Sequence, residues 1–254
     1  MMGAQGAPEW MGVACGWGCA PVAGEKNRHL GGIRLFSELS KESLAHLERL
    51  CAWCNFSEGA EILTRNSTSR EVFFVVEGAV SIVNYSTSGR EIAYTIIEQG
   101  DYFGELAAID QKPRSAHVVA VRPCLLAMLK PEAFEQALRH TPEIAWRVMH
   151  KLAAIIRIND ERIMDLSTLG APQRIHTQLL RLAKPDPVTA GRWMIYPLPT
   201  QNEMAARVST TRETVARVIS QLAGEGIVEK KGRTLYINKW ETLAALSGQG
   251  AGPG

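Results

Sequence analysis

The sequence predicts an α+β protein in which an antiparallel β-roll is followed by a long helix and then by a smaller domain of short helices and a β-hairpin. Three observations predict this class. Between residues 71 and 130, β-branched and aromatic segments are separated by turn residues, which is typical of an antiparallel sandwich or roll. Apolar residues then recur three and four apart, as in a helix. The last region combines helix-capping signals with a strand–turn–strand.

The composition is that of a water-soluble globular protein. The chain has 254 residues, of which 46% are hydrophobic and 21% are charged, and this length suits one large domain or two ordinary ones. No apolar run approaches the roughly 20 residues of a membrane helix. The N-terminus lacks the apolar core of a secretory signal. We therefore expect a cytoplasmic protein without a membrane partner.

The domain boundaries follow from changes in pattern along the chain. Residues 1–30 are rich in glycine and alanine without a period, which predicts a disordered extension, and a disordered tail is predicted at 246–254. A helix is expected from Ser40 to about Trp53, at the start of a β-roll domain that spans 31–141.

The long helix is expected at 142–168. Its apolar positions alternate three and four residues apart and form a seam: Met149, Leu152, Ile156, Asn159, Ile163 and Leu166. This spacing favours a seam shared with a second copy of the chain, although a core helix on the roll would show a similar stripe. Gly170 and Pro172 then favour a hinge at 168–172, before a last domain at 169–245.

Charge is distributed unevenly. Residues 171–254 contain eleven Lys and Arg against six Asp and Glu, whereas residues 1–170 contain seventeen against twenty. A basic C-terminal region indicates a polyanionic partner, although a solvated basic face would give the same count.

Two helix starts define the C-terminal domain. Thr200 and Glu203 form a capping box at one of them, and Thr211 can cap a second helix. Near the start of this second helix, three charged side chains lie off the buried stripe: Arg212, Glu213 and Arg217. Arg can donate two hydrogen bonds to guanine and Glu can accept one from cytosine in the major groove, so the pattern is typical of a helix-turn-helix.

An ordinary surface helix with an ion pair between Glu213 and Arg217 would show part of this pattern. The basic hairpin tip that follows favours the DNA-binding interpretation, because a wing at this position can contact phosphates. The tip contains Lys230, Lys231 and Arg233.

The segment "RETVARVISQLAGEGIV" followed by this wing resembles the C-terminal domain of the Crp/Fnr superfamily of dimeric bacterial regulators. The resemblance covers roughly residues 33–245 and implies a homodimer that binds palindromic double-stranded DNA and acts with RNA polymerase. It implies DNA contacts from Arg212, Glu213, Arg217, Thr200, Thr211 and Lys231. One departure is Ser209, in a turn where the family usually has glycine.

The front half carries a second resemblance to the same family, in Phe103-Gly104-Glu105-Leu106 and Pro113-Arg114-Ser115-Ala116. In the family this cassette lies in a β-roll (jelly-roll) that holds a cyclic nucleotide. A guanidinium can neutralise the cyclic phosphate, a short helix beginning near Gly104 can present backbone N–H groups to it, and a carboxylate can accept from the ribose 2′-OH. The implied site contains Gly104, Glu105, Leu106, Arg114, Ser115 and Ala116.

The alternative for this cassette is a structural ion pair between Glu105 and Arg114 in a roll that binds nothing. Base recognition is expected from the long helix, where alignment by the seam implies Asn159 and Asp160. Asn159 can instead fix the register of a dimer seam, and Asp160 can simply pair with Arg157 or Arg162. Because a carboxylate can accept two bonds from guanine, Asp160 slightly favours cGMP over cAMP as the effector.

Three rival functions remain. An iron–sulfur or redox sensor on the same scaffold would use cysteines, but the spacing of Cys15, Cys19, Cys51, Cys54 and Cys124 does not match, and free buried cysteines usually pack as small hydrophobes. No metal is therefore expected. An enzyme is not expected, since no catalytic triad order, metalloprotease helix or P-loop occurs. A ligand-independent DNA-binding regulator would result if side chains fill the pocket.

Overall fold

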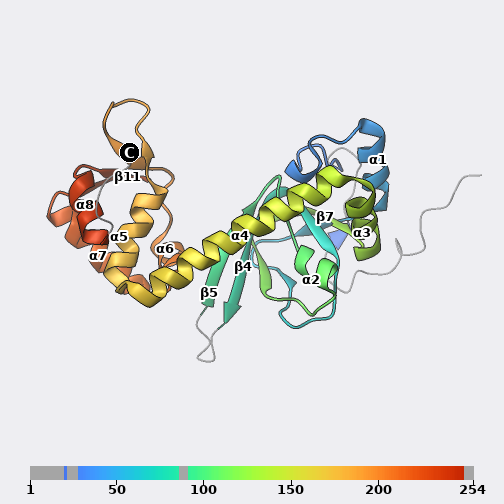
Figure 1. Cartoon of the computed structure of the whole chain (residues 1–254), viewed down its shortest axis with the longest axis horizontal. Coiled ribbons are helices and arrows are strands. Elements are labelled where there is room, and N and C mark those ends of the chain that lie inside the picture. Colours follow the sequence, from blue (N-terminus) through green and yellow to red (C-terminus); the bar gives the residue numbers. More distant parts are fainter. Residues whose placement is uncertain (1–19, 22–27, 86–90, 249–254) are drawn as a thin grey trace, which may run out of the picture. The chain divides into compact units, whose positions relative to one another are not determined.

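The computed structural model describes residues 20–21, 28–85 and 91–248. The chain divides into two compact units, residues 1–152 and 153–254, with the division inside the long helix α4, Pro142–Thr168 (Figure 1). Mixed helices and strands confirm the predicted α+β class. In the described part of the chain, no helix is both long enough and apolar enough to cross a membrane.

The first unit contains the predicted antiparallel roll. Its sheet has the strand order β1-β2-β7-β4-β5, with β3 paired to β7 and β6 paired to β4. The strands are β1 Ala20–Pro21, β2 Cys51–Phe56, β3 Glu61–Leu63, β4 Val72–Tyr85, β5 Glu91–Glu98, β6 Tyr102–Phe103 and β7 His117–Leu129.

Strand β4 is buried on both faces of the sheet. Phe73 and Val75 pack into one apolar cluster, whereas Val72 and Phe74 pack into another. Successive side chains of a strand point to opposite faces, so the continuous apolar run in β4 supplies both clusters. The Phe73 ring stacks on that of Phe103, with centroids 5.1 Å apart, and this contact fixes the strand that leads into the cassette.

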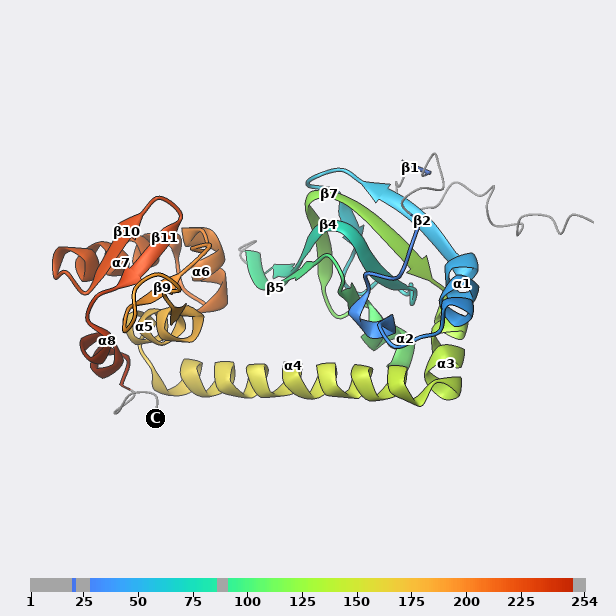
Figure 2. The same cartoon turned by 90° about the horizontal axis from the view of Figure 1, so that it is seen from above.

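Helices close one side of the roll. These are the short helix η2, Arg34–Phe36, then α1, Lys41–Leu50, α3, Pro131–His140, and the first turns of α4. Their apolar faces pack into the cluster that contains Val72 and Phe74 of β4. Helices α1 and α3 lie side by side at the same end of the roll (Figure 2).

Two expectations at the start of this unit need correction. The helix predicted to reach Trp53 ends at Leu50, because Cys51 pairs with Leu129 and begins strand β2. Helical spacing of apolar residues was outweighed here by tertiary pairing. Within the extension predicted at 1–30, β1 pairs with β2 and Leu30 is fully buried in the core. Residues 1–19 and 22–27 lie outside the described residues.

The second unit is a helical domain with a small antiparallel sheet. Its helices are α5 Ala171–Leu182, α6 Gln201–Arg207, α7 Arg212–Gly224 and α8 Trp240–Ser247. The strands, in the order β10-β11-β9-β8, are β8 Lys184–Pro185, β9 Trp193–Ile195, β10 Val228–Lys231 and β11 Thr234–Ile237. Helix α8 extends two residues into the tail predicted at 246–254, of which 249–254 lie outside the described residues.

The long helix α4 is present with the predicted bounds. Its buried side chains are Ile144 and Val148, both near its start. Seam positions Met149, Ile156 and Ile163 are 53%, 59% and 62% exposed. Apolar side chains at this exposure are unusual unless another surface covers them, and the seam shared with a second copy stays a prediction.

Candidate nucleotide-binding and DNA-binding sites

The two halves of the cassette come together at one pocket of the roll. Strand β6 ends at Phe103, and α2, Glu105–Asp110, follows directly, as predicted. The second half precedes β7. The cassette residues that line the pocket are Gly104, Glu105, Leu106, Arg114, Ser115 and Ala116. Leu63, Ile82, Phe103, Ala107 and Val118 complete its wall.

Gly104 is required by its surroundings. Its φ of +86° lies in the left-handed region, which favours glycine. A Cβ at this position would lie 2.8 Å from Nη1 of Arg114 and 2.9 Å from the carbonyl oxygen of Glu71. The absence of a side chain therefore lets the Arg114 guanidinium lie against the backbone of the cassette.

The Arg114 side chain is only 3% exposed, and its guanidinium points into the roll. Nε donates to Ser69 Oγ at 3.0 Å, Nη1 to the Gly104 carbonyl at 2.9 Å and Nη2 to the Glu71 carbonyl at 2.8 Å. Burial lowers the pKa of Arg114 to about 10, against the opposing effect of nearby Glu71 and Glu105. A pKa of that size keeps the guanidinium charged near neutral pH, as a phosphate-binding group requires.

Glu105 is also buried, at 6% exposure. Burial raises the pKa of Glu105, while the charge of Lys151 acts in the opposite direction. Among the described residues, the carboxylate that lies within 4 Å of the Arg114 guanidinium belongs to Glu71, at 3.6 Å. The predicted alternative of a direct Glu105–Arg114 ion pair is therefore not the arrangement seen, and Glu105 remains available to a ligand hydroxyl.

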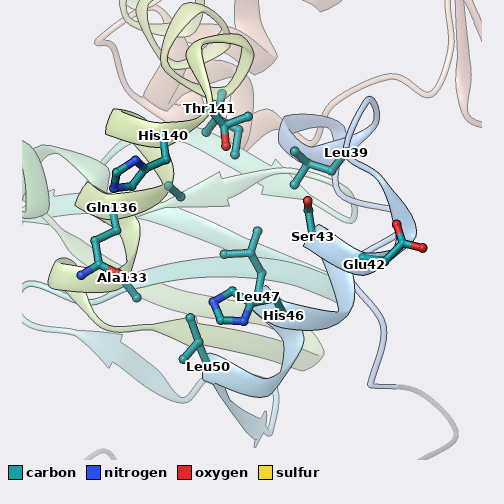
Figure 3. A pocket seen from close by; sticks show the side chains of 12 residues that line it. Leu39, Glu42, Ser43, His46, Leu47, Leu50, Ala133, Gln136, His140 and Thr141 are labelled. Carbon is teal, nitrogen blue, oxygen red and sulfur yellow. The ribbon is translucent and has the colours of Figure 1, made fainter.

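The cassette pocket is small, with a volume of about 60 Å³. Ligand pockets typically measure roughly 300–1,000 Å³, so a nucleotide would have to extend beyond the present cavity. A larger cavity of about 400 Å³ lies between α1 and α3. Figure 3 shows His46 of α1 and His140 of α3 in its wall. None of its described lining residues is Lys or Arg, whereas Arg114 lines the cassette pocket.

Asn159 and Asp160 are exposed on α4 and belong to the second compact unit. The cassette belongs to the first unit. Their role in reading the base therefore stays a prediction.

The helix-turn-helix is formed as its capping signals predict. Thr200 Oγ1 accepts from the backbone N–H of Glu203 at 3.2 Å, and Glu203 accepts in return from the N–H of Thr200 at 2.7 Å. Thr211 Oγ1 accepts from the N–H of Thr214 at 3.2 Å. The first two turns of α7 carry three exposed charged side chains: Arg212, Glu213 and Arg217.

The turn between α6 and α7 contains Ser209 in the left-handed region, at a φ of +52°. Two arginines that the sequence analysis did not single out stabilise this turn. Arg162 donates to the Ala206 carbonyl at 2.9 Å and to Ser209 Oγ at 3.0 Å. Arg174 donates to the Val208 and Ser209 carbonyls. These bonds compensate for a serine where glycine is the usual residue.

The wing is the β10–β11 hairpin, with Gly232 at its tip. Lys230 and Arg233 are exposed beside it. Lys231 is 60% exposed, but its Nζ pairs with the Glu229 carboxylate at 2.9 Å. Part of the charge expected from the wing is therefore already neutralised within the hairpin.

The described cysteines do not form a metal site. Cys51, Cys54 and Cys124 are buried, and burial raises the pKa of Cys51 to about 12. A thiol with that pKa stays protonated near neutral pH and is a poor metal ligand. No metal-binding cluster of His, Cys, Asp and Glu occurs among residues 20–21, 28–85 and 91–248. Cys15 and Cys19 lie outside these residues.

Comparison with known families agrees with both sites. The cyclic nucleotide-binding domain family matches residues 53–141, and the Crp-like helix-turn-helix domain family matches residues 173–246. The two matches cover the cassette and the helix-turn-helix, respectively.

Characterised relatives are similar along most of the chain. The cAMP-activated global transcriptional regulator Vfr of Pseudomonas aeruginosa is 29% identical over 202 residues, which cover 76% of this chain and 94% of Vfr. The cAMP-activated regulator CRP of Salmonella typhimurium is 26% identical over 189 residues, which cover 74% of this chain and 90% of CRP.

A solved structure of a CooA mutant from Carboxydothermus hydrogenoformans shares the fold. Its TM-score is 0.72 at 20% identity, and the match covers 85% of this chain and 95% of that one. With matches to both domain families and to these curated regulators, the chain belongs to the Crp/Fnr superfamily and is a DNA-binding transcription regulator with a cyclic nucleotide-binding domain.

Proposed function

We propose that the protein is a homodimeric transcription regulator whose binding to palindromic DNA is controlled by a cyclic nucleotide. The observation that carries the proposal is the cassette: Arg114 and Glu105, nine residues apart, line one pocket with both side chains buried. A buried, charged guanidinium in a roll is costly unless an anion or several acceptors stabilise it. A cyclic phosphate beside Arg114 and a ribose hydroxyl beside Glu105 would use both groups.

The effector is a 3′,5′-cyclic purine nucleotide, and two observations favour different bases. The curated relatives Vfr and CRP are described as cAMP-activated. Asp160 supports guanine, because a carboxylate can accept hydrogen bonds from N1–H and N2–H₂ of guanine but meets only acceptors at N1 and N3 of adenine. The choice between cAMP and cGMP is therefore the first thing to measure.

The dimer is proposed to form through α4. Exposed apolar side chains at Met149, Ile156 and Ile163 support a seam of the coiled-coil type. Two helix-turn-helix domains related by a twofold axis would then contact successive major grooves about 34 Å apart. Arg212, Glu213 and Arg217 are the side chains proposed to reach the bases, and RNA polymerase is the proposed downstream partner.

Nucleotide-dependent DNA binding tests this function. A duplex selected from a random palindromic library would be titrated with the protein, without nucleotide and with cAMP or cGMP. We expect tighter binding with one of them, no nucleotide effect in Arg114→Leu, and weaker DNA binding in Arg217→Ala at any nucleotide concentration. Calorimetry with each nucleotide, on wild type and Asp160→Ala, assigns the base.

Two results would reject parts of the proposal. Equal DNA affinity with and without nucleotide, together with no calorimetric binding, would establish the ligand-independent regulator instead. Because Arg114 also holds two backbone carbonyls, its replacement can unfold the roll. The Glu105→Gln variant keeps those bonds and provides the second measurement.

A further inference from the structure

The guanidinium that we assign to the ligand phosphate already has an acidic neighbour. The Glu71 carboxylate lies 3.6 Å from Nη2 of Arg114. Glu71 comes directly before strand β4, and its side chain is 26% exposed, whereas that of Arg114 is 3% exposed. The ligand phosphate would therefore be the second anion beside one cation.

Glu71 is held in this place by two hydrogen bonds. Its backbone carbonyl accepts from Nη2 of Arg114 at 2.8 Å. Its carboxylate accepts from the backbone N–H of Arg70 at 3.1 Å. An anionic ligand that approaches Arg114 therefore meets a carboxylate whose position is already fixed.

The N–H groups of Arg114 that remain free define where a ligand phosphate can bind beside the Glu71 carboxylate. A guanidinium has five N–H groups, and three of them are donated to Ser69, Gly104 and the Glu71 carbonyl. One N–H remains on Nη1 and one on Nη2. Since Nη2 is the atom nearest the Glu71 carboxylate, a phosphate oxygen that accepts from it lies close to that negative charge.

We propose that Glu71 is a specificity-determining residue that makes the site select singly charged phosphodiesters over doubly charged phosphate monoesters. This inference rests on the proposed function of the cassette. A 3′,5′-cyclic nucleotide carries one negative charge, whereas a nucleoside 5′-monophosphate carries nearly two above its second pKa of about 6. The Glu71 carboxylate therefore repels one negative charge on the cyclic nucleotide and nearly two on the 5′-monophosphate.

The size of the effect follows from Coulomb's law in a partly solvated site. For charges about 6 Å apart at an effective dielectric constant near that of water, one unit of ligand charge weakens binding about threefold. Removing the Glu71 charge should therefore tighten cyclic nucleotide binding about threefold and monoester binding about tenfold. The preference for the cyclic form would fall about threefold. Added salt should reduce these factors, because the carboxylate is partly exposed.

The substitution Glu71→Gln isolates the charge. An amide oxygen can still accept from the Arg70 N–H, and the backbone carbonyl that holds Arg114 is unchanged. The matched control is Glu98→Gln. Glu98 lies in the same roll, its carboxylate is 3.7 Å from the Arg122 guanidinium, and both side chains are exposed. The Glu98 carboxylate pairs with Arg122 and not with Arg114, so its removal changes net charge equally without touching Arg114.

The experiment is calorimetric titration of the full-length protein at pH 8 and low salt with cAMP, cGMP, 5′-AMP and 5′-GMP. We expect the ratio of cyclic to monoester affinity to fall about threefold in Glu71→Gln and to stay at the wild-type value in Glu98→Gln. If monoesters bind only to Glu71→Gln, that also supports the proposal.

The contrary results separate this inference from the proposed function. If wild type binds a cyclic nucleotide and Glu71→Gln leaves the ratio unchanged, or shifts both ligands by one common factor, Glu71 is not a specificity residue and the proposed function stands. If no variant binds any of the four nucleotides, both proposals are overturned.

Discussion

Lys151 of α4 donates to the Asp101 carboxylate at 2.7 Å and to the Tyr102 carbonyl at 2.6 Å. Its Nζ also lies 3.6 Å from the centroid of the Tyr102 ring. These contacts join the start of the long helix to the strand that leads into the cassette. The charge of Lys151 is also the main favourable one near Glu105. The charge of Lys151 therefore acts both on Asp101 and on the buried Glu105 of the cassette.

The Lys151–Asp101 pair should stabilise the first unit in a pH-dependent way. Burial by itself raises the pKa of Asp101, but the hydrogen bond and charge of Lys151, together with the Tyr102 N–H and the Arg34 charge, outweigh it, so the pKa is lowered. A lowered acid pKa contributes stability above the unfolded value, near 4, and this is lost as the pH falls through the folded value. Lys151→Met should cost about 1–2 kcal/mol at pH 7 and less in acid.

Urea denaturation at pH 7 and near pH 3 measures this effect. The control is Lys112→Met, since Lys112 pairs with Asp110 at 3.9 Å and its side chain is 77% exposed. Surface pairs of this kind contribute little. Equal stability losses in the two variants would contradict the prediction.

Glu105→Gln should stabilise the protein without ligand and weaken nucleotide binding. Burial raises the pKa of Glu105, so keeping it ionised at neutral pH is unfavourable in the folded state. The penalty is present above the raised pKa and is relieved as the pH falls through it toward the unfolded value. At pH 7 we expect a gain of about 1 kcal/mol, or about 2–4 °C in Tm.

Calorimetric melting from pH 7 down to about pH 4 checks the sign, because the gain in Glu105→Gln should shrink as wild-type Glu105 takes up a proton on the way to the unfolded pKa. Nucleotide affinity of the variant should fall about tenfold or more, since a charged acceptor is lost. Glu58→Gln changes an exposed acid of the same roll and should alter neither quantity.

Gly104→Ala should destabilise the roll more than an ordinary glycine replacement. Both Gly104 and Gly59 have positive φ, +86° and +80°. A Cβ at Gly104 meets Arg114 and the Glu71 carbonyl within 3.0 Å, whereas at Gly59 it meets nothing within 4 Å. Gly59→Ala should cost about 1–2 kcal/mol from its backbone alone, and Gly104→Ala should exceed it and abolish nucleotide binding. Similar losses of stability in Gly104→Ala and Gly59→Ala would show that the cassette rearranges to accommodate the added methyl group.

The dimer seam makes a prediction that uses two isoleucines of one helix. Ile156 belongs to the predicted seam, and Ile158 does not, yet both are highly exposed, at 59% and 63%. A buried charge at a seam position prevents association, whereas a charge facing solvent does not. In analytical ultracentrifugation, Ile156→Asp should sediment as a monomer and Ile158→Asp as a dimer. The reverse result would place the contact on another face of α4.

The helix-turn-helix and the cassette could be predicted from the sequence because the residues that define each of them are close together in the chain. The box of Thr200 and Glu203 and the cap at Thr211 act over three residues, and the structure forms both. The cassette likewise joins a glycine, an acid and an arginine within a short stretch.

The rest depends on contacts between distant parts of the chain. Ser69 and Glu71 bind Arg114 from 45 and 43 residues away, and no spacing rule connects them to the cassette. Cys51 showed the same limitation, since its helical spacing gave no sign that Leu129 would pair with it in a strand.

The segment at 168–172, which was expected to act as a hinge, is bridged from both sides. Arg181 of α5 pairs with Asp165 and Glu161 of α4, and Arg162 of α4 holds the turn at Ser209. Ion pairs and hydrogen bonds thus join the last two turns of α4 to α5 and to the turn of the helix-turn-helix. Within the second unit, the segment at 168–172 is therefore spanned by side-chain contacts between α4 and the elements that follow it.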